Sequence, residues 1–171
     1  NTRLQAEDYR KFCGTAPQLM VFGMREALDM IFEEGLENIY ERHRVLAEAT
    51  HAAVEVWSQA GTLSLNAIEP KERSTAVTTI LTDEGVDANK IRDVCRDEMM
   101  VGLGGGLGNL AGRAFRVGHM GDINAPMLFA ALASIEATLS YLDIKFASGG
   151  VTAAIEHVAQ AKKVGAGPFS Y

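Results

Sequence analysis

The chain has 171 residues, of which 47% are apolar and 22% are charged, and its formal net charge is −6. Such values are typical of one globular domain of ordinary size. Lys and Arg are scattered rather than clustered, which excludes the usual signature of nucleic-acid binding. The uncharged stretch at residues 123–135 is too short for a membrane span, which needs about 20 residues. We therefore expect neither nucleic acid nor a membrane as a partner.

The start of the chain and its cysteines indicate where the protein is found. Cys13 and Cys95 lie far apart and match no metal or redox spacing, so we expect reduced thiols and a cytoplasmic protein. No basic segment leads into an apolar one, and we therefore expect no signal peptide. Asn1, rather than methionine, begins the chain, which leads us to expect that translation starts further upstream.

A long helix is the first predicted element. After turn residues at Gly14 and Pro17, apolar residues recur every three or four positions from residue 18 to residue 59. This period predicts a helix roughly 60 Å long at 1.5 Å per residue, with a bend near Gly35 and an end at Gly61. A small domain cannot cover such a length, so part of the helix is expected to pack against something else.

The rest of the chain alternates between the two periodicities. Alternation predicts strands over residues 62–68, 74–82 and 114–118, and helical spacing predicts helices over residues 83–99, 125–141 and 151–162. Asp87 is a candidate helix cap, and Pro126 suits a first helical turn. Residues 99–106 are expected to begin as a short strand and to continue as a loop. This order predicts an α+β fold, a small and mostly antiparallel sheet with helices on one face, preceded by a long helix.

The glycine-rich stretch GLGGGLGNLAGR, residues 102–113, partly matches a dinucleotide-binding fingerprint. Gly106, Gly108 and Ala111 fit the pattern G-x-G-x-x-A. The fingerprint requires a loop that opens a helix, because the helix N-terminus holds the pyrophosphate. Here Gly112 and a predicted strand around Phe115 follow at once. We therefore interpret the stretch as a flexible loop rather than a nucleotide site.

The four histidines predict no metal or catalytic site. His43 and His51 lie eight residues apart on the long helix without His-Glu-x-x-His spacing, and we expect both at the surface. His157 shows nothing distinctive on the last helix. His119 lies in a glycine turn, but a single histidine is not a catalytic constellation. We accordingly assign no catalytic residue and no metal ligand.

Arg116 is the most informative residue, because its guanidinium lies between Phe115 and Val117 in a short apolar strand. The turn Gly-His-Met-Gly follows directly. One interpretation is a structural ion pair with an acid such as Asp122, and the pattern alone favours it. The other is a planar fork that binds a carboxylate through two parallel hydrogen bonds. The glycine turn suits the second, since a ligand can approach the backbone closely there.

Two segments together resemble a known family. The segment FRVGHMGD at residues 115–122, with MREALDMIFEEGLENIYERHRVLAEAT at residues 24–50, is similar to the C-terminal portion of class V pyridoxal-phosphate-dependent aminotransferases. The serine–glyoxylate and alanine–glyoxylate aminotransferases are the closest group. The resemblance extends from about residue 15 to residue 157, and it implies the small domain of a fold-type I aminotransferase.

The resemblance implies roles for two residues. Arg116 matches the arginine that binds the α-carboxylate of the substrate, an amino acid or a 2-oxo acid. Thr15, ten residues before Arg25, matches a threonine that helps to hold the phosphate of pyridoxal phosphate in the neighbouring subunit of a homodimer. The resemblance therefore makes Arg116 substrate-binding and Thr15 cofactor-binding.

The resemblance also implies a missing part. In the family, an N-terminal large domain supplies the lysine that binds the cofactor covalently, and none of the lysines here carries that motif; they are Lys11, Lys71, Lys90, Lys145, Lys162 and Lys163. We expect residues 1–17 to join a missing large domain, residues 18–60 to form a long linking helix, and residues 61–171 to form the C-terminal small domain. Alone, the chain is expected to be inactive and to bind no cofactor.

Two functions of different classes remain open, and a related reaction, such as the transamination of ureidoglycine or phosphoserine, is a third. The first is the C-terminal fragment of an aminotransferase that transfers an amino group from serine or alanine to glyoxylate or a similar 2-oxo acid. The second is a stand-alone, non-catalytic module that binds a carboxylate or a protein. An exposed apolar patch along residues 19–40 would favour the fragment, because the missing domain would cover that patch.

Overall fold

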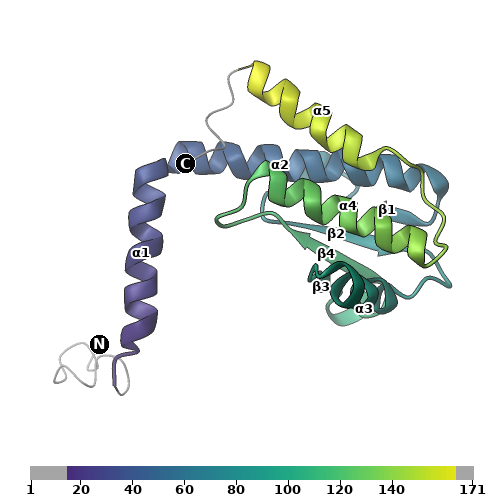
Figure 1. Cartoon of the computed structure of the whole chain (residues 1–171), viewed down its shortest axis with the longest axis horizontal. Coiled ribbons are helices and arrows are strands. Elements are labelled where there is room, and N and C mark those ends of the chain that lie inside the picture. The colour runs from purple at the N-terminus through teal and green to yellow at the C-terminus, as the bar shows by residue number, and fades with distance from the viewer. Residues whose placement is uncertain (1–14, 165–171) are drawn as a thin grey trace. The chain divides into compact units, whose positions relative to one another are not determined.

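The computed structural model describes residues 15–164 (Figure 1). The first fourteen residues of the expected joining segment, with Lys11 and Cys13, lie outside this range. The chain divides into two units, residues 1–39 and residues 40–171, and each is treated by itself below. Across the described residues, no helix is both long and apolar enough to cross a membrane.

The long helix predicted over residues 18–59 is two helices. Helix α1 spans Gln18–Glu34 and α2 spans Leu36–Trp57. Gly35 separates them with φ of +85°, a conformation that glycine adopts without strain, so the helix is interrupted at the position where a bend is predicted. A short 3₁₀ turn, Ser58–Ala60, follows α2 and ends at Gly61, which also has a positive φ of 83°.

The unit of residues 40–171 contains an open antiparallel sheet. Its strands are β1 (Leu63–Leu65), β2 (Val77–Thr82), β3 (Gly104–Gly105) and β4 (Ala114–Gly118), and its further helices are α3 (Ala88–Met99), α4 (Ala125–Tyr141) and α5 (Gly150–Lys163). The strand order is β1-β2-β4-β3, and every neighbouring pair is antiparallel. The predicted α+β class is confirmed.

The helices of this unit cover one face of the sheet, either directly or by packing on another helix. Ile80, Phe115 and Val117 point to that face and join a core built with side chains of α2, α3 and α4. Helix α5 packs on α4 (Figure 1). Side chains of opposite parity on the strands, such as those of Thr79 and Arg116, are only half-buried. Arg116 therefore lies on the sheet face that the helices leave open.

Side chains cap the starts of α3 and α4, and the predicted cap Asp87 is one of them. The Asp87 carboxylate accepts a hydrogen bond of 2.8 Å from the Asn89 backbone N–H and begins α3, five residues later than the predicted start of that helix. The Asn124 side chain accepts one of 3.0 Å from Met127 N–H, ahead of Pro126 in the first turn of α4. Both bonds satisfy donors that a helix start leaves free.

The short strand expected at the beginning of residues 99–106 is placed wrongly. Met99 is still helical, and Met100 ends α3 with φ of 57°. The strand is instead formed by Gly104 and Gly105, which pair with Arg116 and Phe115 of β4. Consecutive glycines normally predict a loop. Here they form a strand, because they pair with β4.

Candidate functional site

Arg116 lies in the middle of β4, opposite Thr79 of β2 and Gly104 of β3. Its Nε donates a hydrogen bond of 2.7 Å to the carbonyl oxygen of Gly105. Among residues 15–164, it forms no ion pair, so the structural pairing with Asp122 is wrong. A half-buried guanidinium with one edge tied to the backbone keeps donors for a ligand.

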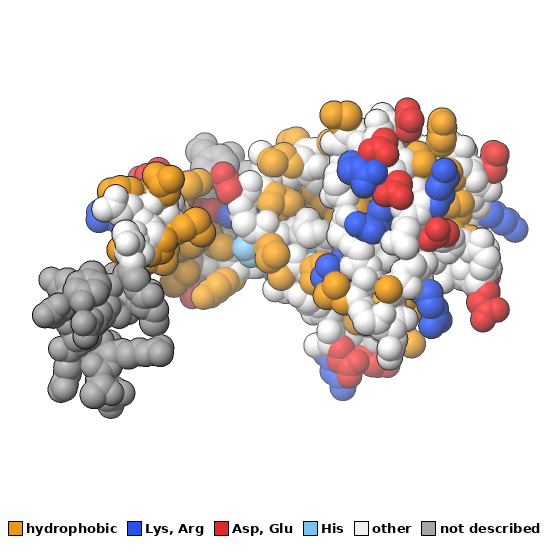
Figure 2. All heavy atoms as spheres, turned by 90° about the horizontal axis from the view of Figure 1, so that it is seen from below, with side chains coloured by type: hydrophobic (Ala, Val, Ile, Leu, Met, Phe, Trp, Pro, Cys, Tyr) orange, Lys and Arg blue, Asp and Glu red, His pale blue; other side chains and the backbone are white. Residues whose placement is uncertain are grey.

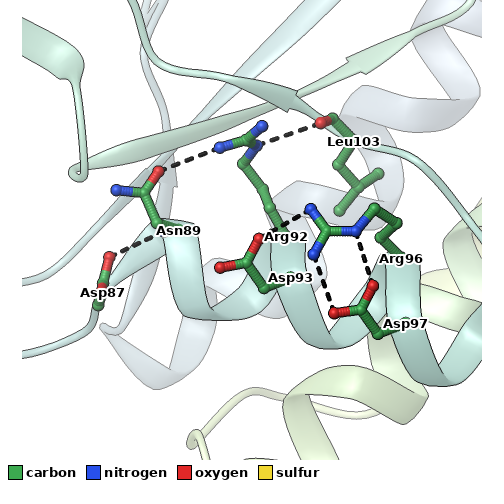
Figure 3. Close-up of polar contacts among 7 residues, drawn as sticks. All are labelled: Asp87, Asn89, Arg92, Asp93, Arg96, Asp97 and Leu103. Carbon is green, nitrogen blue, oxygen red and sulfur yellow. Dashed lines mark hydrogen bonds and ion pairs between the residues drawn. The ribbon is translucent and has the colours of Figure 1, made fainter.

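Strand β3 fits closely between two arginines. A Cβ at Gly104 would lie 3.1 Å from Arg116 Cβ, and a Cβ at Gly105 would lie 3.0 Å from Arg92 Cζ. Arg92, on α3, donates a hydrogen bond of 3.2 Å to Leu103 O and another of 3.1 Å to Asn89 Oδ1 (Figure 3). The two glycines therefore let β3 lie close to the arginine side chains on its two faces.

The loop after β4, residues 119–124, is tied to helix α2. Arg42 is 6% exposed. Its Nη1 donates one hydrogen bond of 2.7 Å to Gly121 O and another of 2.9 Å to Ile123 O. His43 Nε2 lies 3.2 Å from the same Gly121 oxygen. A guanidinium bonded to two carbonyls holds the loop that directly follows the Arg116 strand.

His119 anchors the other side of this loop. It is fully buried, with Nδ1 3.1 Å from Thr75 O and Nε2 2.8 Å from Thr78 Oγ1. Because a carbonyl can only accept, Nδ1 carries the proton and Thr78 donates to Nε2. Burial lowers the pKa of His119 to about 4. A neutral histidine with both nitrogens bonded is structural.

The other histidines also form no cluster with catalytic geometry. His51 is 8% exposed, which corrects the expected surface position, and its ring meets that of His119 edge-on at 6.2 Å. Burial and the nearby Arg73 lower the pKa of His51. His157 pairs with Glu48 at 3.1 Å. In the described part of the chain, no three His, Cys, Asp or Glu side chains could hold a metal.

The glycine-rich stretch does not cradle a nucleotide. It forms β3 and then a three-residue 3₁₀ turn, Gly108–Leu110, instead of opening a helix. A Cβ at Gly106 would collide with the Leu110 carbonyl, so this glycine allows close backbone approach within the chain itself.

Thr15 lies in the other unit, where it is exposed three residues before α1. No side chain caps the start of α1, and its first turn has no acidic residue. The backbone N–H groups at the start of α1 and the Thr15 hydroxyl could therefore donate hydrogen bonds to an anion such as a phosphate.

Helix α1 is apolar and uncovered. None of its residues is buried, and its large exposed side chains are Leu19, Met20, Val21, Phe22, Met24, Leu28, Met30 and Phe32. Figure 2 shows hydrophobic side chains over much of the visible surface of this segment. The exposed apolar patch that distinguishes the two functions is therefore present.

Four residues that contact Arg116, strand β3 or the loop after β4 were not predicted from the sequence. They are Arg42, Arg92 and the pair Gly104–Gly105. Arg42 and Gly121 are 79 residues apart, a separation that local periodicity does not reach. Consecutive glycines beside an arginine strand are a usable signal, because glycine in a strand marks close approach.

The chain is similar to known proteins in sequence and in fold, although no protein-family model matches it. It is 44% identical over 145 residues to the serine–glyoxylate aminotransferase of Methylorubrum extorquens, covering 84% of this chain and 35% of that protein. It is 35% identical over 147 residues to the L-aspartate–glyoxylate aminotransferase of Paracoccus denitrificans, covering 85% of this chain and 36% of that protein.

A solved structure extends the similarity to the fold. The ureidoglycine–glyoxylate aminotransferase of Bacillus subtilis superposes with a TM-score of 0.78 at 26% identity, over 92% of this chain and 41% of that one. The chain spans 35% and 36% of the length of the two curated relatives. The names of all three proteins share glyoxylate and differ in the amino donor.

Proposed function

Since this chain corresponds to the C-terminal portion of class V aminotransferases, we propose that it supplies the substrate-carboxylate site of such an enzyme. The enzyme would transfer an amino group from serine or alanine to glyoxylate or a similar 2-oxo acid. Arg116 carries the proposal: a half-buried arginine on the open sheet face, without an ion pair among residues 15–164.

Arg116 would bind and orient the substrate through its carboxylate. An amino acid donor and a 2-oxo acid acceptor both carry this group beside the carbon that reacts. One guanidinium can therefore orient both, and its planar donors match the two carboxylate oxygens. A half-buried position strengthens these charge-assisted hydrogen bonds compared with a fully exposed one.

Pyridoxal phosphate is the cofactor implied by the relatives, and Thr15 would contribute to holding it. The exposed hydroxyl and the uncapped start of α1 favour a phosphate group, because neither an acid nor a side-chain cap competes there. The bound cofactor would act as the electron sink of the reaction. We propose that the phosphate belongs to the neighbouring subunit and that the covalent lysine comes from outside this chain.

The apolar surface of α1 favours the aminotransferase fragment over a stand-alone binding module. A module that functions alone would need this surface covered or polar, yet Leu19, Phe22 and Phe32 are 86%, 69% and 69% exposed. We propose that α1 packs against a large domain and a second subunit in a homodimer.

A chimera tests the proposal. The chain would replace the corresponding C-terminal portion of the Methylorubrum extorquens enzyme, and transamination between serine and glyoxylate would be measured. We expect activity, with kcat/KM reduced about 10²-fold or more by Arg116→Gln, since two charge-assisted hydrogen bonds are lost. Arg113→Gln, at an exposed arginine just before β4, is the matched control. A folded, cofactor-loaded chimera whose activity does not respond to Arg116→Gln would refute the carboxylate role.

A further inference from the structure

Arg116 is held at only one edge of its guanidinium. The bond from Nε to Gly105 O is 2.7 Å, and no other hydrogen bond of this side chain is found among the described residues. We propose that strand β3, braced by Arg92, positions Arg116 so that a carboxylate binds end-on, at Nη1 and Nη2. This inference rests on the proposed function, because it concerns how the same arginine meets its substrate.

The first support is the fit of Arg116 over Gly104. A Cβ at this position would lie 3.1 Å from Arg116 Cβ, 3.3 Å from Nε and 3.6 Å from Cζ. The side chain of Arg116 therefore lies along the backbone of β3 from its stem to its guanidinium. Because these contacts are tighter than ordinary van der Waals distances at Cβ and Nε, we expect a side chain at Gly104 to shift Arg116 away from the Gly105 carbonyl.

The second support is the brace on the opposite face of β3. A two-residue edge strand has little stability of its own. Arg92 holds it by donating to Leu103 O, the carbonyl just before the strand, and it lies within 3.0 Å of a Cβ placed at Gly105. Arg92 Nη1 also donates to Asn89 Oδ1 beside the capped start of α3 (Figure 3). Arg92 is thus a positioning residue, acting on Arg116 through β3.

The consequence concerns the donors that remain. A guanidinium carries five N–H groups, one on Nε and two on each Nη. A carboxylate can bind either the edge formed by Nε and one Nη or the edge formed by both Nη atoms. With Nε of Arg116 bonded to Gly105, only the second edge remains. The carboxylate then lies along the axis of the side chain, beyond its tip.

Nuclear magnetic resonance of the chain tests both parts. The exchange of the Arg116 Nε–H with water would be measured in the ¹⁵N-labelled chain, followed by titration with acetate. Gly104→Ala and Arg92→Gln should speed exchange and weaken acetate binding, each by about tenfold, the equivalent of one hydrogen bond. Gly102→Ala is the matched control, because a Cβ at Gly102 meets nothing within 4 Å. Arg96→Gln is the second control, since among the described residues Arg96 bonds only to exposed Asp93 and Asp97 on the same helix (Figure 3).

The outcomes separate the two proposals. Positioning is supported when the wild-type Nε–H stays protected at saturating acetate and the two variants lose protection while remaining folded by circular dichroism. Unchanged exchange in Gly104→Ala and Arg92→Gln, or acetate that displaces Gly105 from Nε, overturns the inference alone. A wild-type chain that does not bind acetate overturns the carboxylate role itself, and the inference with it.

Discussion

Arg42 on α2 donates a hydrogen bond of 2.7 Å to the carbonyl oxygen of Gly121, in the loop that leaves the Arg116 strand. The same nitrogen atom also bonds to Ile123 O at 2.9 Å. The position of this loop thus depends on a helix 79 residues earlier in the chain.

Removing this arginine should destabilise the fold. Arg42→Met keeps the apolar stem, removes the donor of Ile123 O and leaves Gly121 O its contact with His43, so we expect the free energy of unfolding to fall by about 2–3 kcal/mol. Urea denaturation measures this value. Arg44→Met serves as the control, because exposed Arg44 pairs, within residues 15–164, only with Glu41 and Glu48, and its loss should cost under about 1 kcal/mol. Equal losses in the two variants would contradict the role given to Arg42.

His119 should make the fold sensitive to acid. Its folded pKa of about 4 lies below the ordinary value of 6.5, so the unfolded chain binds the proton first as the pH falls. Its contribution to stability is therefore complete above pH 6.5 and is lost between pH 6.5 and pH 4, by about 3 kcal/mol at most. His119→Asn should flatten this pH dependence in urea titrations. A slope that survives the substitution would assign the acid sensitivity to other groups, such as His51.

Glu136 should matter as an acceptor rather than as a charge. Its Oε1 accepts a hydrogen bond of 2.8 Å from Trp57 Nε1 and another of 3.1 Å from the Val151 N–H at the start of α5. Glu136→Ala leaves both donors unpaired and should lower the free energy of unfolding by about 2 kcal/mol, whereas Glu136→Gln keeps an oxygen and should cost less. Trp57 is the only tryptophan, so its fluorescence reports the transition directly. The prediction fails if the two variants unfold at the same urea concentration.

Cys95 should be unreactive in the folded chain. It is a free thiol, fully buried on α3, and burial raises its pKa. In a Cys13→Ser variant, a thiol reagent at pH 8 should label Cys95 only after urea is added. Rapid labelling of the native protein would mean that α3 opens easily, which would also weaken the brace that Arg92 gives to β3.

Much of this architecture could be predicted from local chemistry. Asp87 as a cap, Pro126 in a first turn and the strand around Arg116 are all decided by residues within a few positions of each other. The family resemblance, carried by the segments around Arg25 and Arg116, matched the relatives found by sequence and fold.

The parts that could not be predicted depend on distant residues. Gly104 and Gly105 pair with residues of β4 that lie ten or more positions further along the chain, and the Arg116 and Arg92 side chains lie close to their two faces. His51 is buried because the helix carrying it packs beside His119, which is far along the chain. The residues that surround Arg116 thus became visible only with the three-dimensional contacts.

The central claim is that Arg116 binds the substrate carboxylate, and a titration with glyoxylate tests it most directly. Backbone resonances of β4 would be followed in the wild-type chain and in Arg116→Gln, with acetamide as a neutral ligand of similar shape to a carboxylate. We expect saturable shifts with glyoxylate but not with acetamide, and binding weaker by about 10-fold to 100-fold in Arg116→Gln. Equal binding of glyoxylate by the wild-type and Arg116→Gln chains would contradict the claim.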